Sequence, residues 1–247
     1  MGFGFGFGAG SRSFRAAAGS SFNPLSLPAS SGIARLWLDA TRCTNTGNGT
    51  NVTAVTDRAG GTMTVGVTGN EPTFNASNVD YAGAPTFDCG AGQGFLLTNT
   101  GLTTSAFTVV IVGDGTDGVW LQDGNGNYLI NAGGGSGDKV QITSAAGPYL
   151  VGATAKSGVP GVYILVFNGA SSAVYTSAYT ADASGDAGGL SDLTDVTIGL
   201  FGTYNMSGNG LMGSARHGLI YTGALSGPDR NYLLNGFGSE SGLTIGA

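Results

Sequence analysis

Apolar residues in this chain gather in short stretches that glycine, asparagine, aspartate and serine separate. Residues 107–112 (F-T-V-V-I-V), 162–167 (V-Y-I-L-V-F) and 196–200 (V-T-I-G-L) are rich in β-branched and aromatic side chains, which suit a pleated, half-buried surface. Stretches of about four to eight such residues between turn formers predict β-strands. Because the apolar character of residues 107–113 is nearly continuous, we expect a strand there in the centre of a sheet.

Similar stretches predict the remaining strands, at residues 33–40, 63–67, 95–98, 141–143, 162–168, 173–179, 196–201 and 213–221. Residues 119–122 and 128–131 predict a hairpin, because the D-G-N-G-N sequence between them favours a turn. One helix is expected at residues 228–235, where Ser226 can cap the first turn and Pro228 costs no hydrogen bond. The pattern therefore predicts an all-β fold with one short C-terminal helix.

Composition supports the all-β prediction. Glycine supplies 47 of the 247 residues, against an average of about 7%, and strong helix formers are scarce. A chain of 24.5 kDa can bury enough surface to form one sandwich domain. We expect an extended Gly/Phe anchoring tail at residues 1–22, a linker at 23–32 and the sandwich domain at 33–247.

Several short segments occur in an order that is informative. They are L-W-L-D-A at 36–40, V-T-A-V-T-D-R-A-G-G at 52–61, P-T-F at 72–74, P-T-F-D-C-G at 85–90, F-T-V-V-I-V at 107–112, V-Y-I-L-V-F-N-G at 162–169 and G-L-I-Y-T-G-A-L-S-G-P-D-R-N-Y-L-L at 218–234. Together they resemble the concanavalin A-like (laminin-G/pentraxin-type) jelly-roll domains, which implies a sandwich of two antiparallel sheets. One departure is that Val55 and Thr56 stand where family members often have a tryptophan. The fold hosts lectins, glycanases, adhesins and virus-particle proteins, so it does not determine the function.

The first residues alternate phenylalanine and glycine, a period that places Phe3, Phe5 and Phe7 on one face of an extended strand. Short Gly/aromatic openings of this kind resemble those of tailed-bacteriophage virion proteins, where the chain start docks on the particle. We therefore predict partner-docking residues, namely Phe3, Phe5, Phe7, Arg12, Phe14 and Arg15. The alternative is a disordered tail, because glycine loses much freedom on ordering.

We expect no signal peptide, since the basic residues follow the apolar ones, and no membrane insertion.

The net charge and the positions of the acidic residues argue against two functions, namely nucleic-acid binding and glycan hydrolysis. The net charge is −6 without any basic stripe, so we expect no nucleic-acid partner. A glycanase needs two carboxylates on one face, but Glu71 and Glu240 are predicted in a loop and near the end of the chain. Aspartates of the pairs 114/117 and 192/195 lie in turn sequences, where this residue normally binds the local backbone. We therefore expect no enzymatic activity.

Calcium is a candidate ligand for Asp123, Asn125 and Asn127, whose alternation is similar to the start of an EF-hand loop. However, Tyr128 occupies the position of the required glycine, and a tight turn accounts for the segment better. Asp88 and Asp114 could also join a site in three dimensions. We expect no cofactor, and calcium is left open.

Glycan binding needs an exposed aromatic face beside planar polar side chains. The predicted hairpin supplies both, and its candidates are Trp120, Gln122, Asp123, Asn125, Asn127 and Tyr128. Tyr149 and Tyr204 also flank polar loops. The alternative for Trp120 is a place in the core, because tryptophan is highly buried on average.

Cys43 and Cys89 allow either one disulfide or two separate thiols. A disulfide would require an oxidising location or maturation of a particle outside the cell. Both alternatives stay open from sequence.

Three hypotheses for the function follow. In the first, the chain is a structural protein of a bacteriophage-like virion, a capsid decoration or fibre subunit, that displays a lectin-like sandwich. Its partners would be other virion proteins and copies of itself, with host surface polysaccharide as a further contact. It would be made in the cytoplasm without a signal peptide and would lie on the virion surface. The second hypothesis is a free or cell-surface lectin without catalytic activity, and the third is a degenerate glycanase.

Overall fold

The computed structural model describes most of the chain, at residues 22–28, 32–43, 47–60, 62–65, 70–98, 102, 106–115, 118–125, 127–132, 138–144, 147–156, 158–189, 198–202, 210 and 213–246. The expected anchoring tail, residues 1–22, falls outside this part of the chain except for Phe22.

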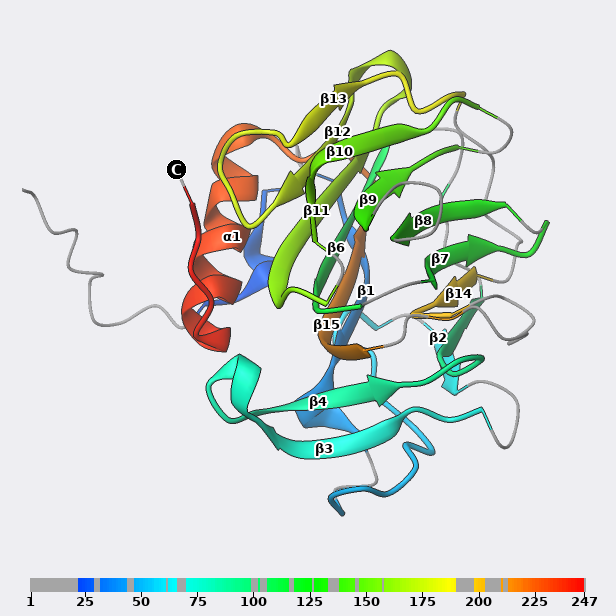
Figure 1. Ribbon diagram of the computed structural model, residues 1–247, viewed down its shortest axis with the longest axis vertical. Helices are drawn as coiled ribbons and strands as arrows, with labels where there is room; N and C mark the ends of the chain where they lie inside the picture. The colour runs from blue at the N-terminus through cyan, green and yellow to red at the C-terminus, as the bar shows by residue number, and fades with distance from the viewer. Residues whose placement is uncertain are drawn as a thin grey trace, which may run out of the picture.

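The described residues form three layers, with one helix, one sheet behind it and a second sheet beyond (Figure 1). Sheet I has the order β13 (Ala183–Gly185), β12 (Ser172–Thr176), β11 (Gly161–Phe167), β6 (Phe107–Gly113), β15 (Gly213–Tyr221), β4 (Ala84–Cys89) and β3 (Thr73–Asn78). β1 (Ala34–Asp39) also pairs with β15. Sheet II has the order β10 (Leu150–Ala155), β9 (Lys139–Ile142), β8 (Tyr128–Ala132), β7 (Gly118–Asp123), β14 (Ile198–Leu200), β5 (Phe95–Thr98) and β2 (Thr62–Val65). All of these strand pairs are antiparallel, which confirms the predicted two-sheet sandwich.

Strand β6 lies in the centre of sheet I, between β11 and β15, and all seven of its residues are buried. Because side chains alternate along a strand, Phe107, Val109 and Ile111 point into the core between the sheets. Val110 and Val112 point the other way, into the layer under the helix. The strand is apolar on both faces because both faces are covered, as the sequence predicted.

Helix α1 (Gly227–Ser241) covers the outer face of sheet I (Figure 1). Its first turn is capped as predicted, since the Ser226 hydroxyl accepts a hydrogen bond from the Asp229 backbone N–H at 3.4 Å. The helix continues past the predicted end at residue 235, because Leu233, Leu234 and Phe237 are buried against the sheet. It ends at Gly242, whose φ of 67° is left-handed and suits glycine.

Residues 22–28 lie against the domain although residues 23–32 were predicted to be a linker. The Phe22 ring packs edge-on against Phe237 with 4.7 Å between centroids. A Cβ at Gly236 would lie 2.0 Å from this ring, so glycine is required inside the helix. The hydroxyl of Tyr221 donates to the Pro24 carbonyl at 3.0 Å, beside the short 3₁₀ helix η1 (Pro24–Ser26). Phe22 and Pro24 are therefore held against the sandwich beside α1.

Candidate functional site

A groove opens where the edges of the two sheets meet the end of the chain. It has a volume of about 620 Å³, within the range of about 300–1,000 Å³ of ligand sites. Its lining comprises hydroxyl side chains, alanines, one lysine and one aspartate, namely Ala153, Thr154, Lys156, Thr176, Ser177, Ala178, Thr180, Ala181, Asp182, Thr244 and Gly246. We call this feature the edge groove.

Three segments build the edge groove. β10 is the last strand of sheet II and supplies one wall. The turn after β12 supplies the second wall and begins at Ser177, which has a left-handed φ of 56°. The C-terminal segment supplies the third wall, since the Gly246 N–H donates to the Ser177 carbonyl at 2.7 Å. The groove therefore depends on contacts between segments that are far apart in the sequence.

Asp182 joins the two sheets at this edge. Its carboxylate accepts hydrogen bonds from the Thr154 hydroxyl at 2.6 Å and from the Thr154 N–H at 3.2 Å. A Cβ at Gly152 would approach the same carboxylate to 2.5 Å, so the close approach of β10 requires glycine there. Asp182 is thus held in place by β10, and both walls of the groove are fixed relative to each other.

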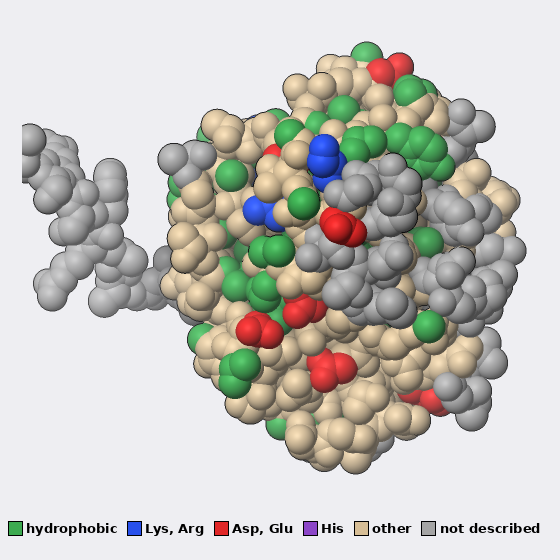
Figure 2. Space-filling view, in the orientation of Figure 1, with side chains coloured by type: hydrophobic (Ala, Val, Ile, Leu, Met, Phe, Trp, Pro, Cys, Tyr) green, Lys and Arg blue, Asp and Glu red, His purple; other side chains and the backbone are tan. Residues whose placement is uncertain are grey.

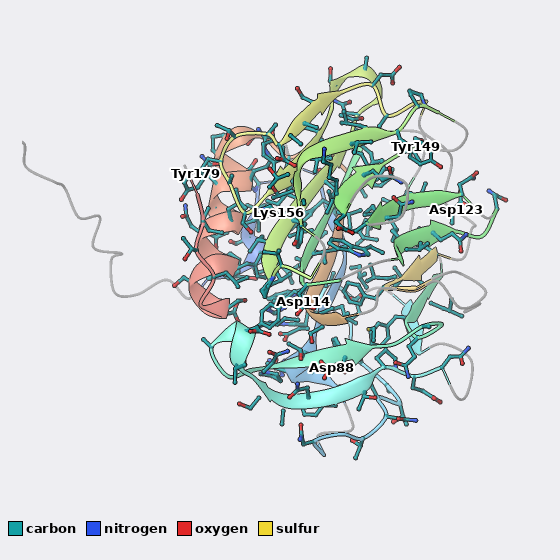
Figure 3. All side chains as sticks on the ribbon, in the orientation of Figure 1. Asp88, Asp114, Asp123, Tyr149, Lys156 and Tyr179 are labelled. Atoms are coloured by element: carbon teal, nitrogen blue, oxygen red, sulfur yellow. The ribbon has the colours of Figure 1, made fainter. Side chains whose placement is uncertain are left out.

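Lys156 lines the edge groove and brings a positive charge to it (Figure 3). In the described part of the chain it forms no ion pair. Tyr179, which follows Ala178 of the lining, is 38% exposed, and its hydroxyl donates to the Asn235 side chain of α1. The groove thus offers hydroxyl groups, a lysine side chain and small apolar surfaces. The aromatic ring of Tyr179 belongs to the residue that follows Ala178 of the lining.

A second polar region lies on the same face of the molecule, over β3, β4 and the start of β15, where Figure 2 shows acidic side chains gathered. Asp88 on β4 accepts hydrogen bonds from the Ser214 hydroxyl at 2.9 Å, the Thr86 hydroxyl at 3.1 Å and the Asn75 amide at 3.2 Å. Asp114, just after β6, accepts one from the Ser214 N–H. Burial is the main cause that raises the pKa of Asp114, and the charges of Asp80 and Asp88 add to it. The carboxylates are therefore held close together.

The aromatic prediction for the β7–β8 hairpin is wrong at Trp120. Its side chain is fully buried and packs edge-on against Tyr163 in the core between the sheets, with 4.8 Å between centroids. The alternative, a core tryptophan, is therefore correct, and this ring has no exposed face for a sugar. Gln122 is also buried, at 4% exposure.

Asp123, Asn125 and Asn127 form the predicted turn. The Asp123 carboxylate accepts hydrogen bonds from the N–H groups of Asn125 at 3.0 Å and Asn127 at 2.8 Å, and from the Asn127 amide at 2.8 Å. Its oxygens are thus occupied by the turn. No group of three or more His, Cys, Asp or Glu residues among those described is placed to hold a metal ion. Glycan contact by the exposed Asn125 stays a prediction, and the side chain of Tyr128 is outside the described residues.

Other candidates are placed as follows. Cys43 and Cys89 are buried free thiols, which corresponds to the second of the two alternatives. The predicted docking residues, Phe3, Phe5, Phe7, Arg12, Phe14 and Arg15, lie outside the described residues, as does Tyr204. Tyr149 is 54% exposed, at the start of β10 (Figure 3). No helix in the described ranges is long and apolar enough to cross a membrane.

The single histidine belongs to a buried network rather than to a surface site. His217 is fully buried, its Nδ1 accepts from the Trp37 indole N–H at 3.4 Å, and it lies 3.9 Å from Asp39. Asp39 also pairs with Arg58 at 2.8 Å, and the Arg58 guanidinium stacks 3.5 Å from the centroid of the Trp37 ring. Burial lowers the pKa of His217 to about 3, although Asp39 opposes this. We call these four residues the buried network, and it holds β1 against β15.

Sequence reasoning missed the edge groove. Its wall β10, L-V-G-A-T-A, is mostly exposed and carries small residues, so it lacks the apolar alternation that marked other strands. The one usable sign was Gly152, since glycine inside a strand often marks a close approach.

Comparison with known proteins supports the fold and identifies no family. No protein-family model and no curated protein matches the sequence. A Trypanosoma rangeli sialidase mutant displaying trans-sialidase activity is similar in structure, with a TM-score of 0.57 at 12% identity, over 90% of this chain and 34% of that one. Domain 4 of AbnA, a GH43 extracellular arabinanase from Geobacillus stearothermophilus in complex with arabinotriose, gives a TM-score of 0.55 at 14% identity, over 85% and 99% of the two chains. The binding domain of Paraclostridial Mosquitocidal Protein 1 gives 0.51 at 11% identity, over 83% and 52%.

The chain therefore spans about a third of the sialidase chains and nearly all of the arabinanase domain. At these identities the similarity establishes a shared β-sandwich fold of the jelly-roll type, and the fold alone does not assign a ligand.

Proposed function

We propose that this protein is a non-catalytic carbohydrate-binding sandwich whose edge groove holds a neutral glycan. The observation that carries the proposal is the lining of the groove, which combines five hydroxyl side chains and three alanine methyl groups with Lys156 and Asp182. A sugar presents hydroxyl groups at its edges and C–H groups on its faces, so this lining can match both. Arabinotriose bound to the structurally similar arabinanase domain supports a saccharide as the class of ligand.

The proposal of a neutral glycan follows from charge. The chain carries −6 overall, and acidic side chains gather on the same face as the groove (Figure 2). This field disfavours the approach of a polyanionic polysaccharide.

A binding role without catalysis follows from the carboxylates of the groove. Glycoside hydrolysis normally uses two carboxyl groups on either side of the scissile bond, about 5–9.5 Å apart. Asp182 is the one carboxylate among the described lining residues, and both of its oxygens accept hydrogen bonds from Thr154. We therefore propose that the groove binds a glycan and leaves it intact.

The test is a pair of matched tryptophan variants. Ala181→Trp fills the edge groove from an exposed position, and Ser184→Trp adds the same side chain at an exposed position on β13 that does not line the groove. Binding of neutral oligosaccharides, arabinotriose first, is measured by calorimetry and on a glycan array. We expect binding by the wild type and by Ser184→Trp, and loss of binding in Ala181→Trp. Equal binding by both variants would contradict the assignment of the site.

A second candidate function is display of this sandwich on a bacteriophage-like virion, as a capsid decoration or fibre subunit. The observation that favours it is the Phe/Gly alternation at Phe3, Phe5 and Phe7, which would suit strand addition to a neighbouring subunit. We propose that a chain lacking residues 1–21 stays folded and no longer joins such an assembly. Unchanged incorporation of the truncated chain into particles would contradict this role.

A further inference from the structure

We propose that the glycan site continues beyond the edge groove to a second subsite at Asp114, where carboxylate oxygens accept hydrogen bonds from the hydroxyl groups of a longer saccharide. This inference rests on the proposed glycan function and extends it, because it makes the ligand a chain of several sugars. We call Asp88, Asp114 and Tyr81 the acceptor cluster.

Of the two carboxylates, Asp114 has more room to accept a hydrogen bond from a ligand. Asp88 has both oxygens engaged by its neighbours on β3, β4 and β15. Asp114 has one oxygen engaged by the Ser214 N–H. No other described residue donates to its second oxygen, and its side chain is half-buried rather than covered. A half-buried carboxylate with a vacant lone pair is suited to a hydroxyl donor.

Tyr81 gives an independent indication of a ligand. The residue is fully buried, yet its hydroxyl has no hydrogen-bond partner in the described structure. Tyr81 belongs to the same buried cluster as Val112, two residues before Asp114. After burial, the charge of Asp114 is the main cause that raises the pKa of this hydroxyl, and Asp80 and Asp88 also contribute. A buried polar group without a partner is costly and requires an explanation. A ligand or an ordered water at Asp114 would complete its hydrogen bonding.

Backbone hydrogen bonds connect the acceptor cluster to the edge groove. The Val159 N–H donates to the Lys156 carbonyl at 3.1 Å, which brings Gly158 and Val159 next to the groove. Lys156 lines the groove, and the Gly158 N–H donates to the Gly115 carbonyl at 3.1 Å, next to Asp114. Val159 is 43% exposed and provides an apolar surface between them. Lys156, Asp114 and Asp88 follow one another down the same face in Figure 3.

The arrangement specifies the kind of ligand. Lys156 supplies donors at one end, Val159 an apolar contact in the middle and Asp114 an acceptor at the other end. A neutral oligosaccharide matches this series, because its hydroxyl groups both donate and accept. A single sugar would occupy the groove alone and would not reach Asp114.

The experiment measures affinity against chain length. Neutral arabino-, xylo- and gluco-oligosaccharides, from disaccharide to hexasaccharide, are titrated into the full-length wild type, Asp114→Asn and Asp80→Asn, in parallel buffers with and without EDTA. Asp114→Asn keeps an oxygen for the Ser214 N–H and replaces the second acceptor by a donor. Asp80→Asn is the matched control, since it removes the same charge from a neighbouring exposed side chain that the proposed subsite does not include.

We expect the affinity of the wild type to rise with chain length and then to level off. Asp114→Asn should weaken binding of the longest saccharides about tenfold, the effect of one charged hydrogen bond, and leave the shortest ones unchanged. Asp80→Asn should match the wild type at every length. If affinity does not rise with length, or if the two variants behave alike, the second subsite is wrong while the groove stands. Binding that EDTA abolishes would overturn it in favour of a cation at the cluster, and no binding by any saccharide would overturn the proposed function as well.

Discussion

Two polar regions on the outer side of sheet I use similar residues in opposite ways. The buried network of Trp37, Asp39, Arg58 and His217 lies in the part of the sheet that α1 covers, and His217 packs 4.9 Å from Phe237 of that helix. The acceptor cluster lies beyond the helix, on β4 and at the end of β6, and Asp88 and Asp114 remain half-exposed. In the buried network opposite charges pair and stabilise the fold, whereas in the acceptor cluster like charges repel one another.

The difference shows that the role of a charged residue depends more on whether α1 covers it than on its residue type. A paired carboxylate under α1 stabilises the fold, because its removal would leave the opposite charge without a partner. A carboxylate crowded by like charges at the surface costs stability, and the binding role that we propose would explain why such a cost is tolerated. Five experiments can break or sharpen this comparison.

The largest effect is expected from Asp39→Ala in the buried network. The change leaves Arg58 without its carboxylate partner and removes the acceptor for the Thr41 N–H and hydroxyl. We expect a loss of about 3–5 kcal/mol in the free energy of unfolding, measured by urea denaturation. A loss below about 1 kcal/mol would show that the network is not structural. Asp186→Ala is the control, because that exposed carboxylate caps only a local turn.

Acid should weaken the same region. The unfolded chain binds a proton at His217 below about pH 6.5, whereas burial keeps the folded histidine neutral until its pKa of about 3. Stability is therefore fully present above pH 6.5 and is lost as the pH falls toward 3, by up to about 1.4 kcal/mol per pH unit. The pKa of Asp39 changes stability in the same direction: burial raises it, but His217, Thr41 and Arg58 lower it below its usual value. Urea denaturation between pH 7 and 4 measures the effect.

The same prediction has a spectroscopic check. Because the chain contains one histidine, its imidazole NMR signals are unambiguous. They should keep the chemical shifts of a neutral ring down to pH 4, and titration near pH 6.5 would contradict burial of His217.

A smaller effect is expected from Arg58→Lys. The variant keeps the charge beside Asp39 but loses the planar stack over the Trp37 ring. Because Arg58 is about a third exposed, we expect a loss of about 1 kcal/mol in the free energy of unfolding. A loss as large as that of Asp39→Ala would mean that the stacked guanidinium, rather than the charge pair with Asp39, dominates.

The smallest effect on stability is expected from Asp114→Asn in the acceptor cluster. A carboxyl group whose pKa is raised on folding contributes stability when protonated and loses it as the pH rises through that pKa. At neutral pH the aspartate is therefore unfavourable, and asparagine should leave the denaturation midpoint unchanged or slightly higher. A lower midpoint would show that Asp114 stabilises the fold, which would remove the contrast between the two regions.

The sequence predicted the parts of the fold that depend on local pattern. The strand Phe107–Gly113 was identified because apolar residues cover both of its faces, and the 119–131 hairpin because its turn sequence is strong. The helix was predicted to end at residue 235, whereas α1 continues to Ser241, because its end depends on long-range contacts such as that of Gly236 with Phe22. Trp120 beside polar residues was an ambiguous pattern, and burial between the sheets decided it.

The candidate site was harder to predict for a physical reason. The edge groove forms only where β10, the turn after Ser177 and the chain end at Gly246 meet. None of these segments carries a motif by itself, and threonine, serine and alanine are common in any exposed strand. Asp88 and Asp114 were noted as partners in three dimensions, but their shared link to Ser214 depends on the register of β15 with β4.

The most direct test of the central claim is glycan binding by the wild type, Ala181→Trp and Ser184→Trp, compared side by side on one array of neutral oligosaccharides. The account predicts that a saccharide retained by the wild type is retained by Ser184→Trp and lost by Ala181→Trp, while all three proteins unfold at similar temperatures. Retention by Ala181→Trp, or the absence of binding by the wild type, would contradict a glycan site in the edge groove.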